Sequence, residues 1–278
     1  MKKKKISIPG IIKWIIALLL VIMQVYPFFY VFTSSFKSLD DFRKLPAYAL
    51  PSKWVLTNFI NVFTKSHMPT YFKNSIILTA ATLFVSAIIG SMASYILAKY
   101  TFKGKSFVYI LFLAGMMIPI QTVIIPLAFT FGKLGIVDNF PVLVLLYSAF
   151  CLSMTVFIVT GYMKGLPDEL EEAAVMDGAG HGIVFFRIIL PLSMPAIASA
   201  SIFNFVSAWN NLLFPLVFIS KDSMKTISIG LLSFFGAYTS DYGAVMAAIG
   251  VSIIPPIIMY ILLQEKMEKG LTAGAVKG

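Results

Sequence analysis

The chain has 278 residues, of which 59% are hydrophobic and only 12% are charged, and its formal net charge is +10. This composition excludes an ordinary water-soluble domain, in which charged residues make up about a quarter of the chain. The basic excess matches the preference of lysine and arginine for the cytoplasmic side of a membrane, so no nucleic-acid partner is expected.

Six windows of the sequence contain no Asp, Glu, Lys or Arg, and each is longer than the roughly 20 residues that a helix needs to cross a bilayer. Lipid cannot bond to free backbone groups, so these windows are expected to be helices. The predicted fold is an all-α integral membrane protein with six transmembrane helices and one cytoplasmic helix between spans four and five. We place the spans at about 12–36, 74–98, 107–131, 140–163, 195–219 and 243–264 of a single membrane domain.

The orientation follows from the basic residues. The run Lys2 to Lys5 precedes the first window, which is too long for a signal peptide and has no cleavage pattern. With this end inside the cell, six spans return the tail 265–278 to the cytoplasm, and the segment 164–191 also faces the cytoplasm. The loops 37–73 and 221–241 then lie outside, the second with a stretch at 226–240 that is too short to cross.

Chemical groups that would support catalysis or ion coupling are missing from the predicted spans. The six charge-free windows hold no ionisable group apart from tyrosines and Cys151, and the two histidines, His67 and His181, lie in loops. Transporters driven by ion gradients usually place charged side chains within the membrane. We therefore expect no metal site and no enzyme, and a partner must supply the energy for any uphill transport.

The stretch "DELEEAAVMDGAGHGIVFFRIILPLSMP", residues 168–195, is rich in acids although it lies between two apolar windows. Pro167 and Asp168 suit a helix start with Asp168 as the cap, and the glutamates that follow favour a helix N-terminus. Gly178 is a helix stop, and Pro191 marks the entry to the next span. Such a helix is either a ligand for a groove in a partner protein or a well-capped solvated loop.

Three motifs carry a resemblance to a known family. Glu172-Ala173-Ala174, then Gly178, then Ile188-x-Leu190-Pro191 have the spacing of the EAA motif of ATP-binding-cassette importer permeases. The stretch "EAAVMDGAG" resembles the sugar branch of that family, and "FNFVSAWNNLLFPLVF" resembles the Trp-Asn element of carbohydrate permeases. The C-terminal "KGLTAGAVKG" looks like the tail of the maltose-type second permease subunit. The resemblance covers nearly the whole chain.

The resemblance implies a function and a set of partners. The segment would dock into a cytoplasmic ATPase through five residues, which are Glu172, Ala173, Ala174, Asp177 and Gly178. ATP and magnesium would be bound by that ATPase and no cofactor by this chain. The other partners would be a second permease subunit, a second ATPase subunit, an extracellular solute-binding protein, a sugar and the lipid of a bacterial cytoplasmic membrane. The tail would reach between the ATPase subunits.

The substrate path is less sharply indicated. Sugars need amides and aromatic faces rather than formal charge, and five residues of the spans offer these groups: Asn204, Trp209, Asn210, Asn211 and Gln121. The four residues of span five either line the path or bond to a neighbouring helix and hold the kink of that span, and Gln121, beside Pro119, is a separate candidate for the path. Another small polar solute, such as glycerol phosphate, is an alternative cargo that would call for Arg or Lys in the path. A stand-alone secondary transporter is a further alternative.

Overall fold

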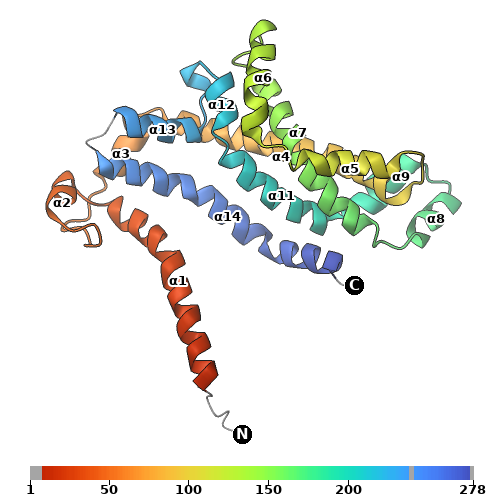
Figure 1. Ribbon diagram of the computed structural model, residues 1–278, viewed down its shortest axis with the longest axis horizontal. Helices are drawn as coiled ribbons and strands as arrows, with labels where there is room; N and C mark the ends of the chain where they lie inside the picture. The colour runs from red at the N-terminus through yellow and green to blue at the C-terminus, as the bar shows by residue number, and fades with distance from the viewer. Residues whose placement is uncertain (1–7, 238–240, 276–278) are drawn as a thin grey trace. The chain divides into compact units, whose positions relative to one another are not determined.

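The computed structural model describes residues 8–237 and 241–275, and these residues are helical or in turns and loops (Figure 1). In chain order the helices are α1 (Ile8–Ser34), α2 (Leu39–Lys44), α3 (Thr57–Thr64), α4 (Met68–Lys99), α5 (Lys105–Gly115), α6 (Ile120–Lys133), α7 (Phe140–Met163), α8 (Glu169–Met176), α9 (His181–Val184), η1 (Phe185–Ile189), α10 (Leu190–Leu192), α11 (Met194–Trp209), α12 (Leu213–Phe218), η2 (Asp222–Met224), α13 (Ile227–Ala237) and α14 (Tyr242–Ala275). The all-helical prediction is confirmed for the described part of the chain.

Four helices of the described ranges are long and apolar enough to cross a membrane, namely α1, α4, α7 and α14. Two further spans are possible if bent helix pairs are counted, so the total rises to six, as the sequence predicts. The two pairs are α5 with α6, bent by 93°, and the run His181–Leu192 with α11, bent by 70°. The third predicted span, 107–131, is therefore broken between α5 and α6, where the sequence has Pro119.

The breaks have local causes. Pro119 precedes α6 with extended backbone angles, φ −67° and ψ 133°, and a proline also disfavours helical angles in the residue before it. At the start of span five the bend falls at Ser193, two residues after the predicted entry at Pro191. The same span is interrupted again after Trp209, because residues 210–212 are non-helical before α12.

The chain divides into two compact units, of which the first comprises Met1–Met68 and Leu231–Ile253. Its loop after α1 is fixed by Asn58, whose Nδ2 donates to the carbonyls of Ser35 at 2.8 Å and Lys37 at 2.9 Å. A Cβ on Gly243 would lie 2.5 Å from the same Nδ2. Glycine at 243 therefore lets α14 approach the amide that holds this loop.

The second unit comprises Pro69–Gly230 and Ile254–Gly278. Within it, α7 packs against α11 and α5, and glycines allow the closest approaches. A Cβ on Gly90 of α4 would lie 2.5 Å from Thr155 Cγ2 of α7, and one on Gly115 of α5 would lie 2.5 Å from Ser153 Oγ. Small residues at such contacts are the usual means of helix packing in membranes.

Two predicted segments end near undescribed residues. The stretch 226–240 contains α13, and positions 238–240 lie outside the described residues. The tail predicted at 265–278 continues α14 as far as Ala275, so most of its backbone is helical. Lys2 to Lys5 and positions 276–278 also lie outside the described residues.

Candidate functional site

The acid-rich segment forms the short helix α8, as the sequence predicts, with Glu169, Glu171 and Glu172 in its first turn. Gly178 ends the helix with φ +82°, a left-handed backbone angle that side chains with a Cβ rarely adopt. The turn is closed by bonds of 2.9 Å from Gly178 N to the Val175 carbonyl and from Ala179 N to the Ala174 carbonyl. The predicted helix stop at Gly178 is therefore confirmed.

The predicted cap is wrong. Asp168 occupies the position before α8 but makes no capping hydrogen bond, and its backbone is already helical at φ −72°, ψ −24°. Its carboxylate instead accepts a hydrogen bond from Lys99, 69 residues earlier, at 2.6 Å. An ammonium group gives a charge-assisted bond, which is stronger than a bond from a neutral backbone amide.

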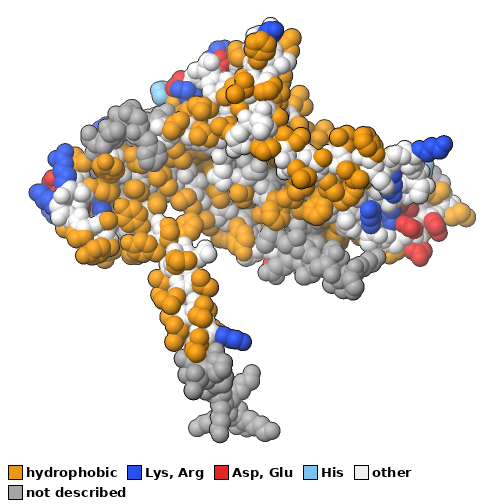
Figure 2. Space-filling model, viewed as in Figure 1, with side chains coloured by type: hydrophobic (Ala, Val, Ile, Leu, Met, Phe, Trp, Pro, Cys, Tyr) orange, Lys and Arg blue, Asp and Glu red, His pale blue; other side chains and the backbone are white. Residues whose placement is uncertain are grey.

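Helix α8 has an inner and an outer face. Glu171 and Ala174, three residues apart, point toward the rest of the second unit, and only 9% of Ala174 is exposed. Glu172, Ala173, Asp177 and Gly178 are exposed, as is Met176 at 86%. Figure 2 shows acidic side chains gathered at the position of α8 with basic side chains beside them. Four of the five predicted coupling residues are therefore accessible, whereas Ala174 packs on the chain's own core.

A buried lysine joins α8 to the end of α4. The side chain of Lys99 is only 5% exposed, and its Nζ donates to Asp168 Oδ1 and to the Leu166 carbonyl, both at 2.6 Å. Glu171 Oε1 lies 3.8 Å from the same nitrogen. The hydrogen bond from Lys99 and its positive charge lower the pKa of Asp168. We call this set of bonds, together with the tyrosine bond described next, the α4–α8 contact.

Tyrosines extend the α4–α8 contact. Tyr95 precedes Lys99 by four residues, so the two side chains lie on one face of α4. The Tyr95 hydroxyl donates to Glu171 Oε2 at 2.8 Å and lies 3.3 Å from the Tyr100 hydroxyl. The Tyr100 hydroxyl lies 2.8 Å from His181 Nδ1, at the start of α9. Polar groups before, within and after α8 are therefore bonded to the end of α4 and to Tyr100, the residue that follows it.

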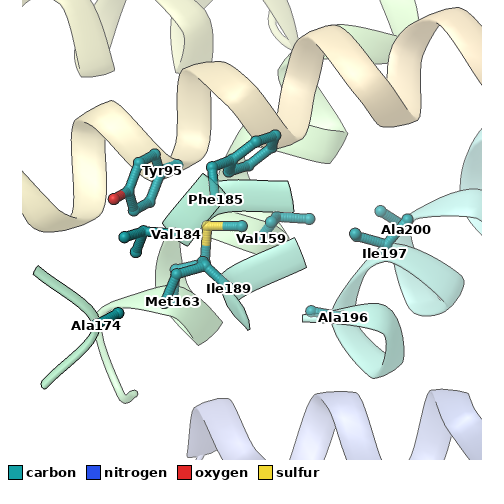
Figure 3. Close-up of a cluster of buried hydrophobic side chains, with 10 residues drawn as sticks. All are labelled: Tyr95, Val159, Met163, Ala174, Val184, Phe185, Ile189, Ala196, Ile197 and Ala200. Carbon is teal, nitrogen blue, oxygen red and sulfur yellow. The ribbon is translucent and has the colours of Figure 1, made fainter. Parts of the chain in front are cut away.

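Apolar side chains fill the space beneath these bonds (Figure 3). The buried cluster takes Tyr95 from α4, Val159 and Met163 from α7, Ala174 from α8, Val184 from α9, Phe185 and Ile189 from η1, and Ala196, Ile197 and Ala200 from α11. Tyr95 also contacts the ring of Phe185 at 5.3 Å. A movement of α8 therefore acts on a packed body that includes the ends of three long helices, since close-packed interiors transmit strain.

A hollow of about 450 Å³ lies beside α8 and is lined by Lys99, Tyr100, Glu171, Glu172, Val175, Met176 and His181. Its walls combine carboxylates with exposed apolar side chains, including Val175 at 50%. Sequence reasoning did not single out Lys99, Tyr95, Tyr100 or His181. The spacing of Tyr95 and Lys99 at the end of an apolar window was the available signal.

One of the polar residues predicted to line the substrate path in span five, Asn204, bonds to a neighbouring helix. Asn204 is buried, and its Nδ2 donates to Thr155 Oγ1 of α7 at 2.8 Å. The Thr155 hydroxyl in turn donates to the Cys151 carbonyl at 3.0 Å. This chain of bonds joins α11 to α7 and satisfies the amide that the sequence placed in an apolar window.

The other predicted path residues have different environments. Trp209 is buried, stacked on Phe205 with ring centres 5.7 Å apart. Asn211 accepts a bond from Phe214 N at 3.1 Å, at the start of α12. Asn210 is exposed at the break after α11, and Gln121 is exposed on α6. The structure therefore brings Trp209, Asn210 and Asn211 together at the interruption of span five, and leaves Gln121 on another helix.

A cavity of about 260 Å³ joins the two interrupted spans. It is lined by Gly115, Met116, Ile118 and Ile120 from the break between α5 and α6, by Phe150, Cys151 and Met154 from α7, and by Phe203, Asn204 and Ser207 from α11. An amide and a hydroxyl among aromatic and aliphatic walls are the groups that suit a neutral polar ligand. The helix break is an addition to the predicted path, and Gln121 does not line this cavity. Within the described ranges, no group of three or more His, Cys, Asp or Glu is arranged to hold a metal ion.

Helices long and apolar enough to cross a membrane, with an exposed acidic helix bonded to one of them, define a helical membrane protein. Residues 88–273 match the family model described as binding-protein-dependent transport system inner membrane component. The chain belongs to this family of binding-protein-dependent permeases, and it is a multi-pass protein of the inner membrane.

Relatives that are named for particular transport systems also support membership of this permease family. The chain is 35% identical to the trehalose/maltose transport system permease protein MalG of Thermococcus litoralis, over 94% of this chain and 95% of the relative. It is 32% identical to the diacetylchitobiose uptake system permease protein NgcG of Streptomyces coelicolor, over 92% of this chain and 85% of the relative. In fold it is similar to a chain of a bacterial ABC transporter that imports the acidic polysaccharide alginate, with a TM-score of 0.81, 23% identity and coverage of 95% and 98%.

Proposed function

We propose that the chain is a permease subunit of an ATP-driven importer for sugars, and that it forms half of the translocation path. The observation that carries this proposal is α8, an exposed acidic helix with the EAA spacing, bonded to the end of a membrane span through Lys99. Its family membership and the printed cargoes of its relatives, trehalose or maltose and diacetylchitobiose, support a sugar as the cargo.

In this proposal the outer face of α8 docks on a cytoplasmic ATPase. Glu172, Asp177 and the apolar side chain of Met176 supply the contact, because they are exposed together on one short helix. Gly178 sets the turn that presents them. Ala174 supports the contact from inside, since it packs against the chain's own core. ATP and magnesium are bound by the ATPase and no cofactor by this chain.

The α4–α8 contact gives the docked helix a mechanical connection to the membrane. When nucleotide closes an ATPase dimer and moves α8, the bonds from Lys99 and Tyr95 carry the displacement to α4. The cluster around Val159, Met163 and Ile197 carries it to α7 and α11. These helices line the cavity beside Asn204, so the same movement changes the access of that cavity.

The remaining subunits follow from the resemblance and from the family. A second permease completes the path, two ATPase subunits drive it, and an extracellular solute-binding protein delivers the sugar to the loops 37–73 and 221–241. Both termini lie in the cytoplasm. Asn204, Ser207 and Asn210 are the polar groups that this chain offers to the sugar at the cavity and at the break of span five.

The first test is a pull-down of the tagged chain from native membranes in mild detergent, with mass spectrometry of the co-purifying chains. The expected result is an ATPase, a second permease and a solute-binding protein. Glu172→Lys, which reverses a charge on the outer face, should remove the ATPase from the preparation and leave the second permease in place.

Lys164→Glu is the matched control, because it also reverses one exposed charge on the same side of the membrane but lies outside α8. It should retain the ATPase. A chain that purifies alone, or a Glu172→Lys variant that still recovers the ATPase and takes up sugar normally, would contradict the proposed coupling.

A further inference from the structure

The first unit contains a buried lysine that the proposed transport cycle does not use. Lys37 follows α1 by three residues and is only 2% exposed. Its Nζ donates to the Ala47 carbonyl at 3.0 Å, whereas an ammonium group has three N–H donors to satisfy. Burying such a charge is costly unless it is paired.

A carboxylate within the chain does not supply the missing charge. No acidic side chain among the described residues forms an ion pair with Lys37. Asp41, buried in the same loop, accepts bonds from Ser38 N at 3.1 Å and from Ser52 Oγ at 2.5 Å. The bond from Ser52 is the main cause of the lowered pKa of Asp41. The Asp41 carboxylate thus bonds to Ser38 and Ser52 and does not pair with Lys37.

The ammonium group lies in the wall of a cavity of about 360 Å³. The cavity is lined by Lys37, Tyr30, Phe42, Leu45, Ala47, Tyr242 and Met246, all of the first unit. Lys37 Nζ lies 6.0 Å from the centre of the Tyr30 ring and 5.7 Å from that of Phe42. The rings of Phe42 and Tyr242 are 5.8 Å apart. The site therefore places a cation beside two aromatic rings, with the ring of Tyr242 next to one of them.

The position of this cavity points to the membrane surface. It lies where α1 is about to end and where α14 begins, and both are candidate membrane spans. Aromatic side chains concentrate at such boundaries. No residue in the apolar window of α1 is buried within the described chain, and Phe29 and Phe32 are exposed. Arg43 and Lys44, next to Phe42 on α2, are exposed and basic.

We propose that this cavity, the Lys37 pocket, binds the phosphate of a phospholipid headgroup. The phosphate accepts hydrogen bonds from the unused N–H groups of Lys37, the rings of Tyr30 and Tyr242 contact the glycerol region, and Arg43, exposed on α2, adds positive charge. The bonds from Asn58 to the Lys37 and Ser35 carbonyls hold the pocket in place without the lipid. The inference requires that α1 and α14 lie in a membrane, and it does not depend on the cargo.

The test is native mass spectrometry of the chain with its co-purifying subunits, after exchange into detergent containing phosphatidylglycerol or an uncharged diacylglycerol. The expected result is retention of phosphatidylglycerol and not of diacylglycerol. Lys37→Met should weaken that retention about tenfold or more, because it removes a charge-assisted bond. Lys53→Met, the same change at an exposed lysine of the same loop, should retain the lipid.

Two further variants distinguish a loss of lipid binding from misfolding of the loop. Lys37→Arg keeps the charge and should retain the lipid, and Tyr242→Leu should weaken retention while leaving the bond from Lys37 to Ala47 intact. Equal retention of phosphatidylglycerol by Lys37→Met and the unaltered chain would overturn the proposal. So would equal retention of the uncharged diacylglycerol, or displacement of the lipid by inorganic phosphate alone, which would identify a site for a free anion.

Discussion

Lys99 Nζ and Asp168 Oδ1 lie 2.6 Å apart although 69 residues separate them in the chain. The lysine belongs to a helix that crosses the membrane and the aspartate to the start of a helix that faces solvent. One hydrogen-bonded ion pair thus joins the helix proposed to meet the ATPase to a helix of membrane-spanning length.

Replacing Lys99 by methionine should uncouple ATP hydrolysis from transport. The substitution keeps the apolar length of the side chain but removes the bonds to Asp168 and to the Leu166 carbonyl. Coupling through such networks changes by about threefold to thirtyfold when a member is removed, and we expect that loss in sugar moved per ATP hydrolysed in proteoliposomes. Lys99→Arg should retain most of the coupling.

Lys103→Met is the control for this measurement, because Lys103 is a nearby but exposed lysine. It should behave as the unaltered chain. A Lys99→Met variant with an unchanged ratio of sugar to ATP would show that α8 acts on the membrane helices by another route.

The ion pair between Lys99 and Asp168 also predicts that the stability of α8 depends on pH. Lys99 lowers the pKa of Asp168, so the folded protein favours the charged carboxylate more than the unfolded chain does. The resulting stabilisation is complete above the ordinary aspartate pKa of about 3.9 and is lost as the pH falls through the lowered folded value. Hydrogen exchange of the α8 amides should therefore accelerate below about pH 4 beyond its ordinary pH dependence. In Asp168→Asn this additional acceleration should be absent.

The turn after α8 predicts an order among substitutions at Gly178. Its φ of +82° strains any residue with a Cβ, although no neighbouring atom lies within 4 Å. Asparagine tolerates left-handed angles and valine does not. Gly178→Asn should therefore keep most sugar uptake and Gly178→Val should lose it, with equal amounts of both proteins in the membrane. Equal uptake by the two variants would show that the backbone angle is not what the site needs.

These residues also show what the sequence could reveal. The stop at Gly178 was predictable, since it depends on one residue and its neighbours. The cap at Asp168 was not, because the competing donor, Lys99, comes from a distant helix. Asn204 presents the same difficulty, since its partner Thr155 is known only once α7 and α11 are packed. Pro119 indicated an interruption of span three but not its bend of 93°.

The approach of α4 to α7 predicts a destabilised variant and its rescue. A Cβ at position 90 would lie 2.5 Å from Thr155 Cγ2. Gly90→Ala should therefore cost about 1–3 kcal/mol, the usual cost of overpacking, measured by thermal or denaturant unfolding of the detergent-solubilised chain. Thr155→Ser removes that methyl group and keeps the hydroxyl that Asn204 donates to, but it also keeps the Cβ that would lie 2.9 Å away, so it should restore part of the loss in the double variant.

Gly132→Ala is the matched control, since no atom lies within 4 Å of a Cβ at that helical position. It should leave the unfolding transition unchanged or raise it slightly, because alanine favours a helix more than glycine does. A destabilisation equal to that of Gly90→Ala would attribute the effect to helix chemistry and not to the contact with Thr155.

The proposed orientation in the membrane can be checked with single cysteines. The one native cysteine, Cys151, is only 4% exposed, so the unaltered chain should not react with a membrane-impermeant maleimide. Met176→Cys on α8, 86% exposed in the unaltered chain, should react in inverted membrane vesicles stripped of ATPase subunits and not in intact cells. Tyr48→Cys in the loop 37–73, at a position 76% exposed, should show the opposite pattern. Labelling of both from the same side would refute the predicted topology, because an odd number of spans must separate the two positions if α8 is cytoplasmic and the loop after α1 is not.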